Sequence, residues 1–176
     1  MQLIATLVHP DLKSTDGNVL RRHAVRGIVT RGSSILLLYT ERYNDFSFPG
    51  GGLDPGEDRV AGLAREMQEE TGARNVKVVA EYGYIEEFRP FWKPEFDLMH
   101  MTSHFFSCEI DQDLGEIQME SYELDNGMRP VWVDIGEAVA HNKAVMAGKE
   151  KSMGLSIYRE TFMLERIAGD LLALPA

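Results

Sequence analysis

Hydrophobic and polar positions along the first third of the chain alternate in short runs that predict β-strands. Gln2–His9 reads as a first strand. His23–Thr30 and Ser34–Thr40 are two β-branched-rich runs joined around a Gly-containing turn, so we expect them to pair as a β-hairpin. Tyr43–Asp54 then combines aromatic residues, Pro and Gly, which is typical of a loop.

The pattern changes to a helical repeat after this loop. Apolar residues recur at helical spacing within Asp58–Thr71, and Gly72 follows as a stop signal. Further along, the pattern predicts three strands, separated in part by a Pro-bearing loop at Arg89–Pro94, and then two helices. The predicted strands are Val76–Phe88, Leu98–Ile110 and Val131–Val133, and the predicted helices are Ile135–Met146, begun by Asp134 and Glu137, and Met153–Leu172.

Strands thus outnumber helices, and one helix lies between strands in the middle of the chain. This order predicts an α/β protein of the α+β type, with a mixed sheet between layers of helices. A chain of 176 residues is long enough for one domain with a substantial core and short for two, so we expect a single domain over residues 1–176.

The formal net charge of −10 argues against a general nucleic-acid binder, which would present a basic face. Cys108 is the only cysteine, so an internal disulfide is excluded and a reducing compartment is favoured. The longest apolar runs are far shorter than the ~20 residues that span a bilayer, and the N-terminus lacks a signal-peptide pattern. We therefore expect a cytoplasmic protein with no membrane partner.

Three glutamates on the mid-chain helix form a candidate functional site. Glu66, Glu69 and Glu70 stand at i, i+3 and i+4, which places them on one face of the helix. Such like charges repel and raise one another's pKa unless a cation lies among them. Carboxylate oxygens suit Mg²⁺ or Mn²⁺, so this face predicts a site for one of these ions. The alternative for a lone acidic helix is a solvated surface.

The residues around this helix make the pattern specific. Gly51 precedes Glu57 by six positions, and Arg65-Glu66 follows eight and nine positions later. Met67 is aliphatic, and Glu69-Glu70, Gly72 and Ala73 complete the run. This stretch, residues 51–73, resembles the box motif of the Nudix hydrolases, and only Ala73, which is small for the final aliphatic position, departs mildly from it.

The resemblance implies a Nudix-like α/β/α sandwich with a mixed central β-sheet. It also implies Mg²⁺-dependent (or Mn²⁺-dependent) hydrolysis of a diphosphate linkage in a nucleoside diphosphate-linked small molecule, by attack of water on phosphorus. By resemblance, Glu66, Glu69 and Glu70 hold the metal, together with the Gly50 carbonyl, and Arg65 pairs with Glu57 to orient the helix. The general base is either a box glutamate, Glu66 or Glu69, or a carboxylate of the later polar segment, Glu120 or Glu123.

Arginines and aromatic residues near the motif are candidates for substrate contacts. Arg22 lies just before the first hairpin strand, Arg26 lies within it and Arg42 follows the second, where they could meet phosphates or serve solubility only. Phe48 borders the glycine loop and could stack on a base or pack in the core. His100 and His104 lie ~13 Å apart on one predicted strand, so packing is the better interpretation than metal binding.

The sequence leaves several questions open. Nucleoside triphosphates, nucleotide sugars, dinucleotides and ADP-ribose all remain possible substrates, and the protein could be a monomer or a homodimer. The alternative to an enzyme is a catalytically silent Nudix domain that binds a nucleotide for regulation, although such a domain would be free to lose the box glutamates, and none is lost here.

Overall fold

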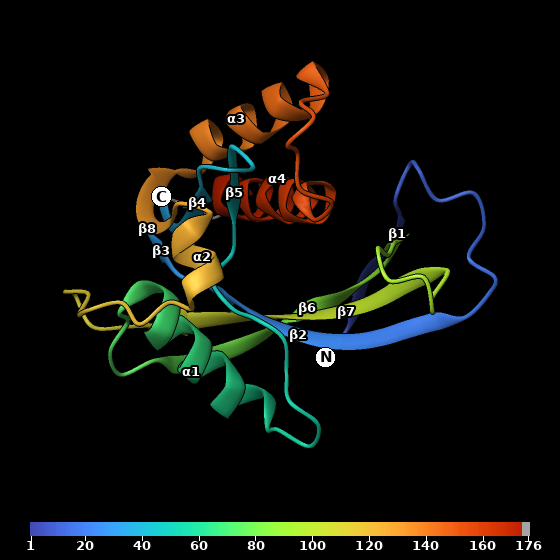
Figure 1. Ribbon diagram of the computed structural model, residues 1–176. Helices are drawn as coiled ribbons and strands as arrows, with labels where there is room; N and C mark the ends of the chain where they lie inside the picture. Colours follow the sequence, from blue (N-terminus) through green and yellow to red (C-terminus); the bar gives the residue numbers. More distant parts are fainter. Residues whose placement is uncertain (174–176) are drawn as a thin grey trace.

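Two four-stranded sheets form the centre of the molecule in the computed structural model, which describes residues 1–173 (Figure 1). In the first sheet, β1 and β6 are parallel, β6 and β7 are antiparallel, and β7 and β2 are parallel. This sheet is therefore mixed, as the sequence predicts. Its strands, in spatial order, are β1 (Leu3–Val8), β6 (Lys77–Pro90), β7 (Leu98–Glu109) and β2 (Val19–Ile28).

The second sheet is antiparallel and is organised around one buried strand, β4 (Ser34–Thr40). One edge of β4 pairs along its whole length with β8 (Met128–Asp134). The other edge pairs with the short strands β3 (Thr30–Arg31) and β5 (Asp45–Ser47). The strand β5 lies inside the stretch predicted to be a loop.

The predicted hairpin is wrong for most of its first strand. Only Thr30–Arg31 pair with β4, whereas the preceding run belongs to β2 and pairs in parallel with β7. The reason is burial on both faces: Val25 packs in the core cluster that contains α1 residues, and Ile28 packs in the cluster on the opposite side. A strand that is covered on both faces pairs with another strand long enough to match its apolar run. Proximity in the sequence does not determine which strand that is.

The helix α1 (Arg59–Thr71) covers one side of the sheets, and the sequence predicts it to within one residue. An Asp58 side-chain oxygen accepts hydrogen bonds from the backbone N–H groups of Val60 and Ala61, which caps the first turn. Gly72 ends the helix in a left-handed conformation, with φ of 70°. Leu63 and Met67 bury the apolar face, and the glutamates lie on the adjoining face, where Glu70 is itself buried.

The helices α3 (Ile135–Gly148) and α4 (Ile157–Ala173) cover the other side, as Figure 1 shows. Their apolar residues join Phe48 and Phe105 in the larger core cluster. Helices on both sides of the sheets give the predicted α/β/α layering. The sequence did not indicate the short helix α2 (Ser121–Asp125), which lies before β8.

Two further regions complete the comparison with the sequence. The strand β6 continues to Pro90, so it takes in the start of the segment predicted as the Arg89–Pro94 loop. His100 stacks on Phe88 with ring centroids 4.3 Å apart, which supports packing for this histidine. Within residues 1–173, no helix has the length and hydropathy needed to cross a membrane.

Candidate active site

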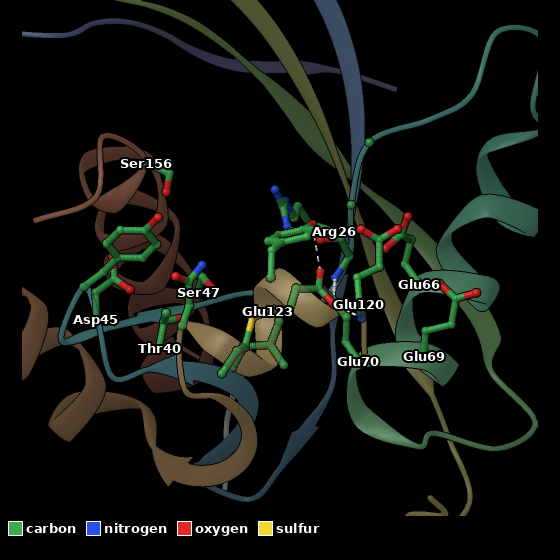
Figure 2. A pocket seen from close by; sticks show the side chains of 18 of the residues that line it. Arg26, Thr40, Asp45, Ser47, Glu66, Glu69, Glu70, Glu120, Glu123 and Ser156 are labelled. Carbon is green, nitrogen blue, oxygen red and sulfur yellow. Dashed lines mark hydrogen bonds between the residues drawn. The ribbon is translucent and has the colours of Figure 1, made fainter. Parts of the chain in front are cut away.

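A cavity of about 440 Å³ opens between α1, the glycine loop, β5 and α2. Figure 2 shows Glu66 and Glu69 toward one end of this cavity and Asp45 and Ser156 toward the other, with Arg26 between them. The volume falls in the range of small-molecule sites. The three glutamates of α1 all line the cavity, so the sequence-based grouping of Glu66, Glu69 and Glu70 is found in space.

Glu70 is the most buried of the three, with 5% of its surface exposed. Its carboxylate accepts a hydrogen bond from the backbone N–H of Gly50 at 2.6 Å. Burial raises the pKa of Glu70 to about 8; the Gly50 N–H and Arg26 oppose this rise, and Glu123 and Glu66 add to it. Burial also raises the pKa of Glu66. Buried carboxylates with raised pKa values are groups that a bound cation would stabilise in the charged form.

Gly50 cannot be another residue in this backbone conformation. Its φ is 129°, and a Cβ there would lie 2.1 Å from the carbonyl oxygen of Val25. Gly51 lies against the helix α1, because a Cβ there would lie 2.4 Å from the carboxyl carbon of Glu66 and that side chain would have to move. The glycines therefore bring the main chain against β2 on one side and against a site carboxylate on the other.

Arg65 makes the predicted pair with Glu57. Its Nε and Nη2 donate to the two carboxylate oxygens of Glu57 at 3.0 and 3.1 Å, in a bidentate arrangement. The hydrogen bond from Arg65 holds the pKa of Glu57 below its usual range. Arg65 Nη1 also donates to Glu66 at 2.8 Å and to Glu69 at 3.4 Å. One guanidinium thus ties the loop before α1 to two of the site carboxylates.

The donor set suits Mg²⁺, although its members do not converge in this conformation. Glu66, Glu69, Glu70 and the Gly50 carbonyl offer the hard oxygen ligands that this ion prefers, around one cavity. Within residues 1–173, however, no three His, Cys, Asp or Glu side chains lie close enough together to hold a metal ion as they stand. Arg65 engages Glu66, and Arg26 donates to the Gly50 carbonyl, so protein cations take up these oxygens.

The later polar segment contributes its carboxylates through α2. Glu120 and Glu123 both line the cavity (Figure 2). Glu123 is buried, and its oxygens accept hydrogen bonds from the Glu120 backbone N–H at 2.8 Å and the Tyr122 hydroxyl at 3.0 Å. Glu120 is exposed. The two candidates for the general base therefore differ: Glu123 stabilises α2, whereas the Glu120 carboxylate is open to solvent.

The arginine candidates separate in the structure. Arg22 and Arg26 line the cavity, as expected for residues that meet phosphates. Arg42 does not line it; its Nη1 donates to the Asn126 side chain at 2.9 Å, so the expectation of a substrate contact by Arg42 is not supported. Arg89, which the sequence analysis did not single out, lines the cavity from the end of β6. No local motif marks Arg89, because only the pairing of β6 with β7 brings it to the site.

The expected substrate contact by Phe48 is corrected by its burial. The side chain is 0% exposed and packs edge-on against Phe105, with ring centroids 5.5 Å apart. It therefore belongs to the core and cannot stack on a base. The polar wall at this end of the cavity is formed instead by residues such as Asp45, Ser47 and Thr40. Burial and the nearby Glu160 raise the pKa of Asp45 to about 7.

The fold and this cavity define a class of protein: an α/β/α sandwich with glutamates presented behind a glycine loop. The family model of the NUDIX domain matches residues 20–153, and the chain belongs to the Nudix family, whose members are typically pyrophosphohydrolases. A solved structure, a NUDIX hydrolase from Nitrosomonas europaea, superposes with a TM-score of 0.50 at 18% identity, over 69% of this chain and 78% of that one. At that identity, the likeness supports the fold alone.

Two curated relatives match parts of the chain. "Nudix hydrolase 5" of Arabidopsis thaliana is 29% identical over 108 residues, which are 60% of this chain and 32% of the relative. "RNA pyrophosphohydrolase" of Campylobacter jejuni subsp. doylei is 46% identical over 39 residues, which are 22% of this chain and 25% of the relative. The matches thus span about a third and a quarter of the length of these relatives.

Proposed function

We propose that this protein hydrolyses a diphosphate linkage in a nucleoside diphosphate-linked small molecule, in a reaction that depends on Mg²⁺ or Mn²⁺. The observation that carries the proposal is that four charged positions of the Nudix box, Arg65, Glu66, Glu69 and Glu70, line one cavity. The fifth, Glu57, braces Arg65, and arginines line the same cavity. A surface cluster of acids would not need a glycine at position 50, where the main chain lies against the Val25 carbonyl with φ of 129°.

The chain's own residues would divide the work as follows. Glu66, Glu69, Glu70 and the Gly50 carbonyl would hold the cation, which would neutralise charge on the phosphoryl oxygens and acidify the attacking water. Arg65 and Glu57 would keep these carboxylates in place. Arg22 and Arg26 would bind the phosphates, which explains how a protein with a net charge of −10 can accept an anionic substrate.

Glu120 is the residue we propose to accept the proton of the attacking water. Its side chain lines the cavity and is exposed to solvent. The Glu123 carboxylate, by contrast, accepts a hydrogen bond from the Glu120 backbone N–H. A general base contributes about 100-fold or more to the rate, so Glu120→Gln should lower kcat by about that factor at unchanged melting temperature. Glu123→Gln should instead lower the melting temperature, because it weakens the bonds that begin α2.

Glu116→Gln is the matched control for this comparison, because Glu116 is an exposed glutamate of the same segment that does not line the cavity. It should leave both kcat and stability unchanged. A larger loss of kcat in Glu123→Gln than in Glu120→Gln, at equal stability, would assign the proton transfer to Glu123 instead.

The function itself is tested by a screen for phosphate-bond cleavage in the presence of Mg²⁺ or Mn²⁺. The substrate classes are nucleoside triphosphates, nucleotide sugars, dinucleotides and ADP-ribose, and products are separated by anion-exchange chromatography. We expect one class to be cleaved at a phosphorus–oxygen bond, so that hydrolysis in ¹⁸O-labelled water places the label in a phosphate product. Absence of turnover in all classes with both metals would contradict the proposal.

A second candidate function is a silent domain that binds a nucleotide without turnover. One observation favours it: Arg26 donates to the Gly50 carbonyl, one of the expected metal ligands, and Arg65 engages Glu66. If these contacts persist when a nucleotide binds, no metal site forms. The screen, combined with melting curves, separates the two functions. A silent domain would be stabilised thermally by a nucleotide and would release no product with either metal.

A further inference from the structure

A second cavity, of about 600 Å³, adjoins the candidate active site. The two cavities share Arg22, Tyr43, Arg89 and Ser156 in their walls, so they adjoin each other at these residues. The second one lies between the loop that joins β6 to β7 and the loop that joins α3 to α4. Each cavity alone has the volume of a small-molecule site, and the pair therefore fits a substrate with two bulky ends.

The walls of the second cavity differ in chemistry from those of the first. Carboxylates and hydroxyl groups dominate the first, whereas Phe91, Trp92, Met153 and Leu155 contribute to the second. Trp92 is 80% exposed, an unusual state for the largest apolar side chain. Lys93 Nζ lies 5.3 Å from the centroid of the Trp92 ring. An exposed indole on the rim of a cleft offers a flat surface on which a planar ring can stack.

The junction of the two cavities is cationic. Arg89 is about four-fifths buried as a side chain, with its Nε 4.0 Å from the Glu87 carboxylate and its Nη2 3.5 Å from the Met99 sulfur. The Glu87 carboxylate is shared with Arg159 at 2.6 Å, so it neutralises Arg89 only in part. Arg22, from β2, is exposed beside it. Two guanidinium groups at the junction would complement phosphates that lie between the two ends of a substrate.

We propose that the second cavity is a subsite for a planar aromatic ring, carried by the substrate on the far side of its diphosphate, and that Trp92 stacks on this ring while Arg22 and Arg89 contact the phosphates between. This inference rests on the proposed function and narrows it to diphosphates with an aromatic group at each end. Dinucleoside diphosphates are the class of compound with this chemistry. A single nucleotide would leave the aromatic cavity empty.

Fluorescence tests the subsite without turnover. The chain has two tryptophans, so Trp132→Phe leaves Trp92 as the only one, and Glu70→Gln in addition suppresses hydrolysis. Titration of this double variant with diadenosine diphosphate in Mg²⁺ should quench the Trp92 emission, whereas ADP, which lacks the second base, should bind and leave it nearly unchanged. Equal quenching by both ligands would overturn the proposal. Absence of quenching by either ligand, when calorimetry shows that both bind, would also overturn it.

Turnover gives the second readout. Stacking on an aromatic side chain strengthens the binding of a base, so Trp92→Ala should raise KM for the dinucleoside diphosphate by about tenfold at unchanged kcat. It should leave KM for ADP-ribose unchanged, since that substrate carries a sugar at its second end. Trp92→Phe should restore the low KM, and Val79→Ala, at an exposed apolar position of β6 outside the cleft, should change nothing.

The outcomes separate this proposal from the proposed function. Quenching by the dinucleoside diphosphate without turnover of any substrate by the wild-type protein would support the subsite and contradict the hydrolase. Turnover with equal KM values in wild type and Trp92→Ala would support the hydrolase and overturn the subsite. A nucleoside diphosphate with a linear alkyl group that quenches Trp92 equally would show that the cavity recognises apolar surface in general, and would also overturn the proposal.

Discussion

Replacement of Glu70 by Gln is expected to lower kcat by about 1,000-fold, equal to about 4 kcal/mol of lost transition-state stabilisation. Glu70 is buried at the centre of the site, beside Glu66 and behind Gly50. A glutamine keeps the shape of the side chain and an oxygen that can accept the Gly50 N–H. It removes the negative charge that a cation would need.

The fold should survive this change because of the burial of Glu70. A neutral amide costs less to bury than a carboxylate without a cation. The metal-free variant should therefore melt at or slightly above the temperature of the metal-free wild type. Glu109→Gln is the matched control: its side chain is 67% exposed and pairs with Lys77 at 3.5 Å, and both turnover and stability should be unchanged. Near-normal kcat for Glu70→Gln would disprove the metal-site assignment.

Removal of divalent cations with EDTA is expected to abolish turnover, and excess Mg²⁺ or Mn²⁺ should restore it. The physical reason is that the site carboxylates and the Gly50 carbonyl then bond to Arg65, Arg26 and the Gly50 N–H, as they do in this structure. The arginines of the cavity then remain, but the divalent charge that would acidify the attacking water is missing. Undiminished turnover in EDTA would rule out the metal requirement.

The same experiment has a pH signature in stability. Burial raises the pKa of folded Glu70 from 4.5 to about 8. Between these two values the folded state binds more protons at this group than the unfolded state, so the group makes metal-free stability fall as pH rises through this window. A cation removes that cost. The rise in melting temperature on addition of Mg²⁺ should therefore be larger at pH 8 than at pH 6, and Glu70→Gln should lose this difference.

The local pattern was informative wherever chemistry and secondary structure depend on neighbours in the chain. The helix over Asp58–Thr71 was found to within a residue, because its cap, its apolar face and its terminal glycine all lie within a few positions. The pairing of Arg65 with Glu57 is what the resemblance to the Nudix box implies, and the structure contains it. The Glu66, Glu69 and Glu70 face follows from helical periodicity alone.

Long-range pairing was where local pattern failed. Local pattern predicts that His23–Thr30 pairs with the next run in sequence, yet β2 pairs with β7, which lies about 80 residues away. The same limit explains the arginines. Arg89 lines the cavity from β6, whose partner β7 is a separate segment. Arg42 is not among the lining residues and donates to Asn126, which lies in a distant segment.

The sequence by itself determined the family, the class of fold and the acidic helix, because the Nudix box is a run of spaced residues whose roles depend on one turn and one helix. The tertiary structure alone decided which side chains face the cavity. It buried Phe48 against Phe105, placed Glu120 and Glu123 beside Glu70, and joined a second, aromatic cavity to the first at Arg89. These contacts connect elements far apart in sequence. They depend on the close packing of the sheets and helices, and no local pattern in the sequence encodes that packing.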